Sequence, residues 1–395
     1  MFENKQKMTS NLKYSCLFGG GAIRGLAYVG TIRAMEELNI EFDIIGGSSV
    51  GSVIATLLAC GYKSYELESL FLKVNYELFK DIHFGLGKDF GLSKGEIFID
   101  WLNELISRDR KKKNLTFADL DKNLVIISTN LDTFKTQEFS KYTTPDFEIA
   151  RAIRVSSSMP GLMPPFEYKG ARLVDGDLQK ASPMWKLSET VNSSKSRIIE
   201  FRLEGEAAQE SKNPLSFINT IYSCVTDVAT DFVKEIYGQN DRYECIKLET
   251  GDMFFADFNL DKDTRRKVIE NGYKQTLDYF KNVLPAKRKK LLGIYSQILK
   301  FLKKANKGLK SNNVEEVQWW FGDIFTVMCE NKELIDEKIY NEILELKNLL
   351  VDSSSRFLIF YSKFKDRKNL EENMQNVINT VDERVADIKL YLQKN

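Results

Sequence analysis

The sequence predicts an α/β fold, a three-layer α/β/α domain with a mainly parallel sheet, followed by an all-helical C-terminal domain. Over the first 180 residues, strand-like runs alternate with helical ones, which is typical of a parallel sheet with helices on both faces. Residues 124–128 read Leu-Val-Ile-Ile-Ser, without polar alternation, as a fully buried strand does. Beyond Pro285 the chain is lysine-rich and then helix-patterned, with no further proline. We therefore expect domains at 13–284 and 285–395.

The strands and helices of the first domain are predicted from apolar runs and from the glycines and turn residues that bound them. The strand-like runs are Tyr14–Phe18, Phe42–Ile45, Leu124–Ser128 and Arg172–Val174. The helical spacings predict helices at Ile23–Leu38, Val50–Ala59, Ile97–Ile106, Phe217–Ile236 and Asp263–Phe280. Three glycines follow the first strand, and an Asp-Gly-Asp turn follows the last one. Functional residues are therefore expected at the ends of these strands.

Composition narrows the class of protein. The hydrophobic fraction of 43% is ample for a core, and a net charge of +1 gives no reason to expect nucleic acid as a partner. Five scattered cysteines and one histidine argue against a Cys/His zinc site, so no metal is expected. The polar N-terminus lacks a signal peptide, and no apolar run is long enough to cross a bilayer. These features favour a cytoplasmic protein.

A G-x-S-x-G motif, Gly47 to Gly51, stands directly between a predicted strand and a predicted helix. A serine on such a sharp turn, here Ser49, holds its hydroxyl clear of the backbone as a nucleophile must. A second match at 91–95 has no strand before it and is interpreted as a capping box in which Ser93 caps the next helix. Ser49 is therefore the candidate nucleophile.

The glycine-rich loop after the first strand supplies backbone donors. Gly19, Gly20, Gly21 and Ala22 lie between a strand and a helix, where free N–H groups and the helix N-terminus favour an oxyanion or a phosphate. A dinucleotide fingerprint would need glycine where Arg24 stands, so it fails. We therefore favour an oxyanion hole opposite the serine.

The base is less clear from the residues alone. The single histidine, His83, lies in a loop-like stretch with no strand end, which favours a surface role. Asp175 follows a strand and precedes Gly176, but Asp-Gly is also a common turn dipeptide. Spacing alone does not decide whether Asp175 is a turn residue or the catalytic base.

Taken in order, these motifs resemble the patatin-like phospholipase family, whose pattern is G-G-G-x-R-G, G-x-S-x-G and D-G-[GA]. The resemblance covers roughly 13–282 and includes the connecting stretches Thr116–Leu120 and Ser157–Pro165. It implies a Ser-Asp dyad of Ser49 and Asp175, with no cofactor, acting on phospholipid or another lipid ester. It also implies an oxyanion hole at the glycine loop and supporting roles for Arg24, Gly47, Gly51 and Gly176.

The sequence departs from the family pattern at two places. Asp177 stands where glycine or alanine is usual, and a carboxylate close to that of Asp175 would disfavour its ionised form. Ala181 and Ser182 precede Pro183 where the family often has asparagine. The first departure bears on the rate more than on the mechanism.

The second domain begins with a basic segment. Residues 286–310 hold nine Lys or Arg and no acid, with an apolar face at helical spacing. Such a helix is a candidate for peripheral association with an anionic membrane, and the alternative is a packed helix with a solvated cationic face. Trp319 and Trp320 carry the same two interpretations. The helical domain is also a candidate site for an activator or for self-association.

These expectations define one function and its rivals. The resemblance implies a lipid acyl hydrolase of phospholipase A or lysophospholipase type that forms an acyl-serine. One alternative is a membrane- or partner-binding module with a vestigial hydrolase site. Another is an acyl hydrolase acting on esters other than phospholipids.

Overall fold

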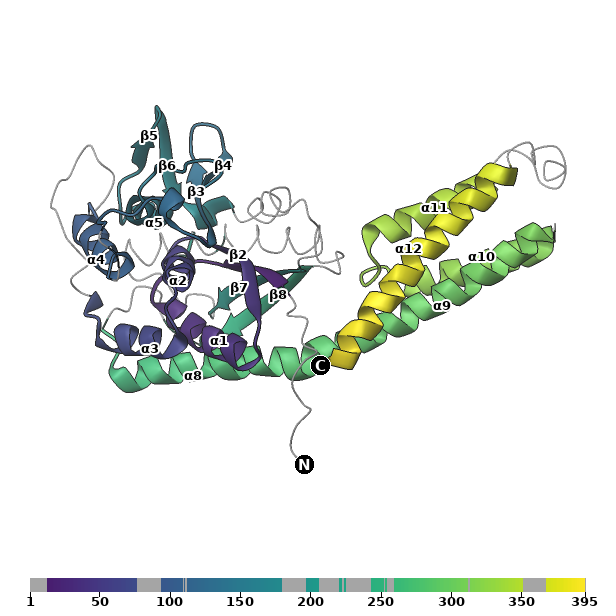
Figure 1. Ribbon diagram of the computed structural model, residues 1–395, viewed down its shortest axis with the longest axis horizontal. Helices are drawn as coiled ribbons and strands as arrows, with labels where there is room; N and C mark the ends of the chain where they lie inside the picture. Colours follow the sequence, from purple (N-terminus) through teal and green to yellow (C-terminus); the bar gives the residue numbers. More distant parts are fainter. Residues whose placement is uncertain are drawn as a thin grey trace. The chain divides into compact units, whose positions relative to one another are not determined.

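The computed structural model describes residues 13–76, 94–108, 110, 112–179, 197–205, 220, 221, 224, 243–251, 253, 259–311, 313–350 and 367–394. Its centre is an eight-stranded sheet of order β5-β6-β3-β2-β1-β7-β8, with β4 also paired to β3 (Figure 1). The strands are β1 Lys13–Phe18, β2 Glu41–Gly47, β3 Asn123–Asn130, β4 Lys135–Ser140, β5 Phe166–Tyr168, β6 Ala171–Asp175, β7 Arg197–Glu204 and β8 Tyr243–Glu249.

The sheet is mainly parallel, as predicted. The pairs β1–β2, β1–β7, β2–β3 and β7–β8 are parallel, whereas β4, β5 and β6 add antiparallel pairs at one end. In the register of β1 and β2, Phe18 pairs with Gly47. Because parallel strands end at the same edge, the segments that follow these two residues come out side by side.

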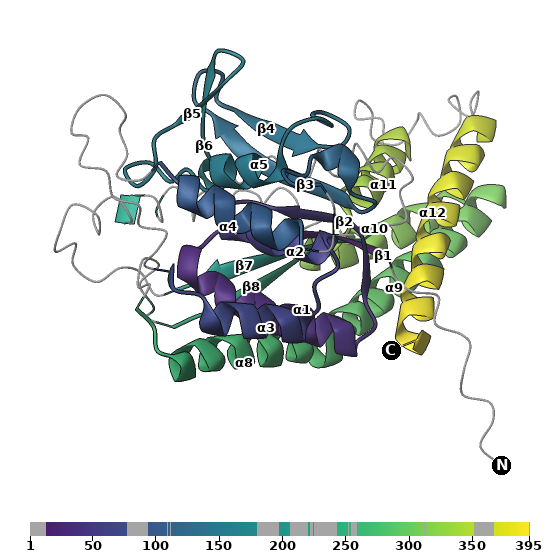
Figure 2. The same cartoon turned by 60° about the vertical axis from the view of Figure 1, so that its left-hand side comes forward.

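The helices of this part of the chain pack in two groups. Helix α2 (Val50–Ala59) contacts β1, β2 and β3, and α5 (Ile149–Ser156) contacts β3, β6 and α4 (Glu96–Ile106). Helices α1 (Leu26–Glu37), α3 (Ser64–Lys73) and α8 (Lys262–Asp278) lie side by side (Figure 2). Short 3₁₀ turns stand at η1 (Ala22–Gly25), η3 (Phe117–Asp119) and η4 (Gly176–Gln179).

The fold class predicted from the sequence is confirmed, with corrections to single elements. The helix predicted at 50–59 matches α2, whereas the first predicted helix divides into η1 and α1. Strands β4, β5, β7 and β8 and helices α3 and α5 were not predicted, because charged residues interrupt the apolar pattern in each of them. The predicted helix at 217–236 falls outside the continuously described ranges. Gly95, not Ser93, is the N-cap of α4.

Helix α2 packs unusually close to the sheet because two glycines remove side chains from the contact. A Cβ added to Gly47 would lie within 3.0 Å of the Gly51 backbone. A Cβ added to Gly51 would lie within 3.0 Å of the carbonyl oxygens of Phe18 and Gly19. Real Cβ atoms do not approach backbone so closely, so only glycine fits at either position. The first turn of α2 is thereby fixed against the ends of β1 and β2.

We expect Gly51→Ala to lower the free energy of unfolding by about 3 kcal/mol or more, because backbone must move to admit the methyl group. The matched substitution Gly293→Ala, at a helical glycine with nothing within 4 Å of the added Cβ, should instead stabilise by about 0.5–1 kcal/mol. Urea denaturation of both variants measures the two effects. Equal effects would contradict the close packing.

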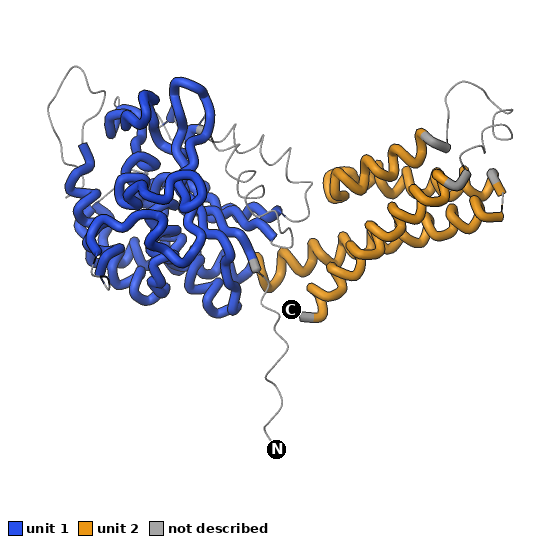
Figure 3. Tube along the Cα trace, turned by 45° about the horizontal axis from the view of Figure 1, so that its top comes forward, with its two compact units in different colours: residues 1–236, 242–278 blue, residues 237–241, 279–395 orange. Residues whose placement is uncertain are grey.

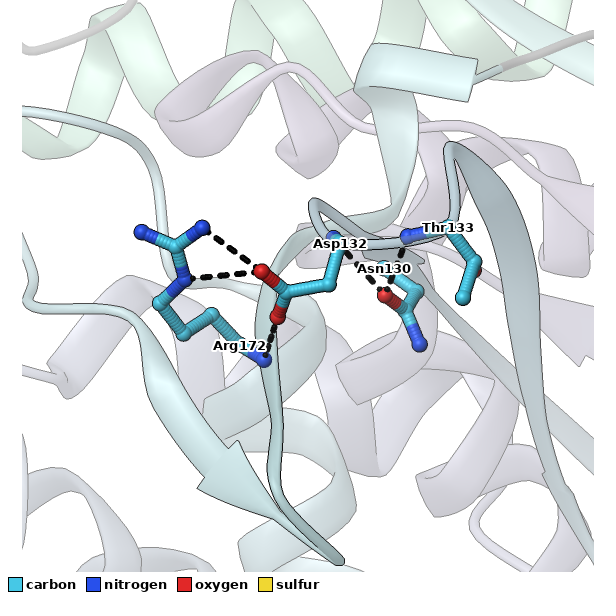
Figure 4. A network of polar contacts seen from close by, with 4 residues as sticks. All are labelled: Asn130, Asp132, Thr133 and Arg172. Atoms are coloured by element: carbon cyan, nitrogen blue, oxygen red, sulfur yellow. Dashed lines mark hydrogen bonds and ion pairs between the residues drawn. The ribbon is translucent and has the colours of Figure 1, made fainter.

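The turn between β3 and β4 is tied to β6 by an exposed polar network (Figure 4). The Arg172 guanidinium donates to Asp132 Oδ1 at 2.6 and 3.1 Å, and the Arg172 N–H donates to Asp132 Oδ2 at 2.7 Å. Asn130 Oδ1 accepts the N–H groups of Asp132 and Thr133. This network fixes the start of β6, the strand that ends in Asp175.

A capping box closes η3 ahead of β3. Asp119 Oδ2 accepts the N–H of Thr116 at 2.8 Å and its hydroxyl at 2.9 Å, and Lys112 Nζ lies 2.6 Å from the same oxygen. The Lys112 ammonium, followed by the Thr116 N–H, lowers the pKa of Asp119 to about 2. The box holds Phe117, which is buried, in the core.

We expect Asp119→Asn to destabilise the protein, and this loss should depend on pH. Since folding depresses the pKa of this carboxyl below its unfolded value of about 3.9, its stabilisation is complete above that value and is lost as the pH falls toward 2. The difference in free energy of unfolding between wild type and variant should therefore be constant from pH 8 to 5 and shrink below pH 4. A constant difference down to pH 3 would contradict this role.

The chain divides into two compact units (Figure 3). The first comprises residues 1–236 and 242–278, and the second comprises 237–241 and 279–395. The division falls where α8 gives way to a π-helical segment, η5 (Tyr279–Val283), followed by α9 (Leu284–Lys310). Pro285 lies in the first turn of α9 and cannot donate a backbone hydrogen bond, which accounts for the widened turn just before it.

The second unit has a helical core of its own. Helices α9, α10 (Val314–Glu330), α11 (Glu337–Leu350) and α12 (Arg367–Lys394) bury one continuous apolar cluster. The apolar face of α9 is part of it: Leu291, Ile294, Tyr295, Ile298, Leu299 and Leu302 are all buried. The packed-helix interpretation of 286–310 is thus confirmed. Trp320 is buried, whereas Trp319 is 63% exposed.

None of the helices in the described ranges combines the length and apolar character that a bilayer crossing requires. All five cysteines are free thiols.

Candidate active site

Ser49 lies on a strained turn between β2 and α2. It is the N-cap residue of α2, with φ 49° and ψ −128°, a conformation that costs a non-glycine residue about 1–3 kcal/mol. Its neighbour Ser48 is buried, whereas Ser49 itself is partly exposed. This is the turn that the G-x-S-x-G motif predicts.

Helix α5 holds the turn in place through Ser156. The Ser49 N–H donates to Ser156 Oγ at 2.9 Å, and Ser156 Oγ donates to the Ile127 carbonyl of β3 at 2.6 Å. The Ser49 carbonyl accepts the N–H and the hydroxyl of Ser52 at 2.9 and 2.6 Å. The strained backbone is therefore restrained on both sides.

Asp175 reaches the same place from another strand. It is the last residue of β6, pairs with Ser128 of β3, and is fully buried. Its N–H donates to the Ser158 carbonyl at 3.0 Å, two residues beyond the one that bonds Ser49. The end of α5 thus ties both predicted residues to one short segment.

Within the described ranges no hydrogen bond joins the Ser49 hydroxyl to Asp175. Asp175 Oδ1 instead accepts the N–H of Asp177 at 2.9 Å. The structure therefore brings the two residues to one site, with their side chains not directly paired.

The glycine loop lies against the serine. A Cβ added to Gly20 would lie within 3.0 Å of Ser49 Cβ. In the described structure the N–H groups of Gly20, Gly21 and Ala22 make no hydrogen bond, whereas the Gly19 N–H donates to the Phe201 carbonyl at 2.9 Å. The first three N–H groups are therefore available to a ligand, whereas the Gly19 N–H is used in a hydrogen bond to the sheet.

The supporting residues shape this loop. The N–H and Nε of Arg24 donate to the Gly21 carbonyl at 3.1 and 3.4 Å, which stabilises the loop from within. Gly176 must be glycine for lack of room, because a Cβ there would lie within 3.0 Å of the Ile127 carbonyl. These bonds are in keeping with the supporting role that the resemblance implies for Arg24.

Asp177, the departure from the family pattern, lies at the centre of the site. Ser48 Oγ donates a hydrogen bond to its Oδ1, and Gly20 lies against its Oδ2. Asp177 is only 3% exposed. A small pocket beside it is lined by Gly19, Ser48, Gly176, Asp177 and Glu200, together with Leu17 and Ile127.

Buried charges surround the pocket. Arg202 Nη2 lies 2.5 Å from Glu200 Oε1, and the Tyr243 hydroxyl donates to Glu200 Oε2. Burial and then the charge of Glu200 raise the pKa of Tyr243. Burial raises the pKa of Tyr28 as well, and the charges of Asp177 and Glu200 raise it further. The Tyr28 hydroxyl donates to the Gly19 carbonyl at 2.9 Å, so it stays neutral and fastens the loop.

Sequence reasoning missed the residues that position the site. Arg154, on α5, is buried and donates to Ser158 Oγ at 2.9 Å and to the carbonyls of Lys94 and Pro164 at 3.1 and 3.2 Å. Burial lowers its pKa. The polar run from Ser156 to Ser158 at the end of α5 was the available signal. His83 lies outside the described residues.

No group of three or more Asp, Glu, Cys or His side chains in the described ranges is arranged to hold a metal ion.

A serine on a strand–helix turn facing free backbone N–H groups is typical of hydrolases. Residues 17–185 match the family model described as patatin-like phospholipase, which confirms the resemblance for this part of the chain.

The chain is similar to proteins of diverse origin. An uncharacterized protein of Acanthamoeba polyphaga mimivirus is 29% identical over 283 residues, 68% of this chain and 94% of that protein. Lysophospholipase NTE1 of Candida glabrata is 28% identical over 192 residues, 43% of this chain but 9% of that protein. The crystal structure of VipD from Legionella pneumophila aligns over 98% of this chain and 92% of that chain, with 15% identity and a TM-score of 0.43.

We expect Ser156→Ala to lower the free energy of unfolding by about 1–3 kcal/mol, because it leaves the Ser49 N–H without its acceptor. Ser107→Ala is the matched control. The Ser107 hydroxyl donates to the Asn103 carbonyl, which also accepts the Ser107 N–H, so the acceptor stays satisfied. Chemical denaturation of both variants measures the effect. A loss for Ser156→Ala no larger than for the control would contradict its role.

Proposed function

We propose that the protein is a lipid acyl hydrolase of phospholipase A or lysophospholipase type, in which Ser49 is the nucleophile and Asp175 the base. One observation carries the proposal: the N–H groups of Gly20, Gly21 and Ala22 make no hydrogen bond in the described ranges, and Gly20 lies against Ser49. Gly20 is buried, and buried backbone donors are normally satisfied, so an unpaired one at a strained serine favours a bound oxyanion.

The chemistry needs two half-reactions. Ser49 Oγ attacks the ester carbonyl carbon, its proton passes to Asp175, and the carbonyl oxygen becomes an oxyanion at the glycine loop. The alcohol departs with the proton from Asp175 and leaves an acyl-serine. Water then attacks the acyl-serine, gives a proton to Asp175, and releases the fatty acid as Ser49 recovers its proton. Each backbone donor contributes about 3 kcal/mol to such a step.

The dyad requires that Ser49 and Asp175 become hydrogen-bonded when substrate binds. Their attachment to one segment, 156–158, supports this, because it holds the backbones of both residues to the same short stretch of chain. Catalytic hydrogen bonds often tighten only in the substrate complex. Asp175 is oriented by the Asp177 N–H, which stabilises its ionised form.

The substrate class is proposed from the family. Residues 17–185 match patatin-like phospholipases, and one relative is named a lysophospholipase. We therefore propose carboxylic esters of membrane lipids as substrates.

We expect wild type to release fatty acid from mixed phospholipid vesicles, Ser49→Ala to be inactive, and Asp175→Asn to lose about 10³-fold or more in kcat. A fluorophosphonate should label wild type at Ser49 and leave Ser49→Ala unlabelled. Labelling without lipid hydrolysis would favour other esters as substrates. No labelling of wild type would favour the vestigial site and contradict the proposal.

Because the proposed relay contains no histidine, kcat/KM should show no fall centred near pH 6.5, the ordinary pKa of histidine. His83→Ala should leave the pH profile unchanged. A limb near pH 6.5 that disappears in His83→Ala would contradict the dyad.

A further inference from the structure

Asp177 is the feature of the site that the proposed mechanism does not use. The family pattern has glycine or alanine at this position, so the carboxylate is an addition in this chain. It is buried and lies among the functional groups, and it is the third residue of the turn that carries the base. Its presence therefore needs a physical account.

The carboxylate is fixed in place by the serine turn itself. Ser48, directly before the nucleophile, donates its hydroxyl proton to Asp177 Oδ1. The Asp177 N–H is also engaged, since it donates to Asp175 Oδ1 at 2.9 Å. The backbone and one carboxylate oxygen of Asp177 are thus both held, so the carboxylate does not rotate away without breaking its hydrogen bond to Ser48.

The other oxygen lies against the glycine loop. A Cβ added to Gly20 would lie within 3.0 Å of Asp177 Oδ2, Asp177 Cγ and Ser49 Cβ. Gly20 is therefore the point at which the loop, the nucleophile and the extra carboxylate meet. The charge of Asp177 also acts on Tyr28, because it contributes to the raised pKa of that residue. The Tyr28 hydroxyl in turn donates to the Gly19 carbonyl in the same loop.

Such a charge opposes the reaction. The transition state places a new negative charge on the carbonyl oxygen beside the same loop, and two like charges in a low-dielectric site repel each other strongly. In wild type this repulsion arises only when the oxyanion forms. It therefore lowers kcat and leaves substrate binding unchanged.

We propose that Asp177 restrains the rate at Ser49 by holding a negative charge, fixed by Ser48, against the glycine loop that receives the oxyanion. The inference rests on the proposed hydrolase function. Asp177, the residue that departs from the family pattern, would thus lower the rate, a role that the residues of the family motifs do not have.

Asp177→Asn is the sharpest test, because the amide oxygen still accepts the Ser48 hydroxyl while the charge is gone. We expect kcat toward a p-nitrophenyl ester, and the rate of fluorophosphonate labelling at Ser49, to rise about tenfold or more, with KM unchanged. Asp121→Asn, which removes one charge at an exposed position, should change neither. Ser48→Ala keeps the charge and should not raise the rate.

The outcomes separate the two proposals. Labelling of wild type at Ser49 with no acceleration in Asp177→Asn would overturn the inference and leave the hydrolase function standing. Acceleration by Ser48→Ala equal to that by Asp177→Asn would also overturn it, since loosening of the turn would then be the cause. Failure of both wild type and Asp177→Asn to label would overturn the hydrolase function and the inference with it. Thermal unfolding confirms that each variant is folded.

Discussion

The close approach of α2 to the ends of β1 and β2 is the constraint on which the site depends. Gly47 and Gly51 let the first helical turn contact the strand backbone, and this contact forces Ser49 into its strained conformation. The packing of α2 against three strands offsets that strain. Any side chain at either glycine would separate helix and sheet and release the serine.

The remaining parts of the site are attached to this turn by hydrogen bonds through one neighbouring helix. Ser156 holds the nucleophile, Ser158 holds the base, and Arg154 fixes the segment between them. The site is therefore assembled from the ends of β1, β2 and β6, three strands of one sheet, and from α5, which packs on β3 and β6. A change in any of these contacts alters the relative positions of Ser49 and Asp175 without touching either.

Charge distribution distinguishes this site from the plain family pattern. The carboxylates of Asp175, Asp177 and Glu200 are buried close to one small pocket or its rim. Glu200 is balanced by Arg202, whereas Asp177 is held by a neutral hydroxyl. The glycine loop, which is suited to bind an oxyanion, thus has the Asp177 carboxylate at its edge. This charge raises the free energy of the transition state in the proposed reaction.

The sequence by itself determined the parallel sheet, helix α2, the serine turn and the glycine loop, because each depends on local periodicity and on glycines at fixed offsets. It also indicated a basic amphipathic helix at 286–310, but left open whether that helix packs in a core or lies on a membrane. Only the tertiary structure decided which N–H groups of the loop stay free, since the Gly19 N–H bonds Phe201 of β7, far away in the sequence. It alone decided that Asp177 meets Ser48 and Gly20, because contacts between separate strands leave no periodic signal in the chain.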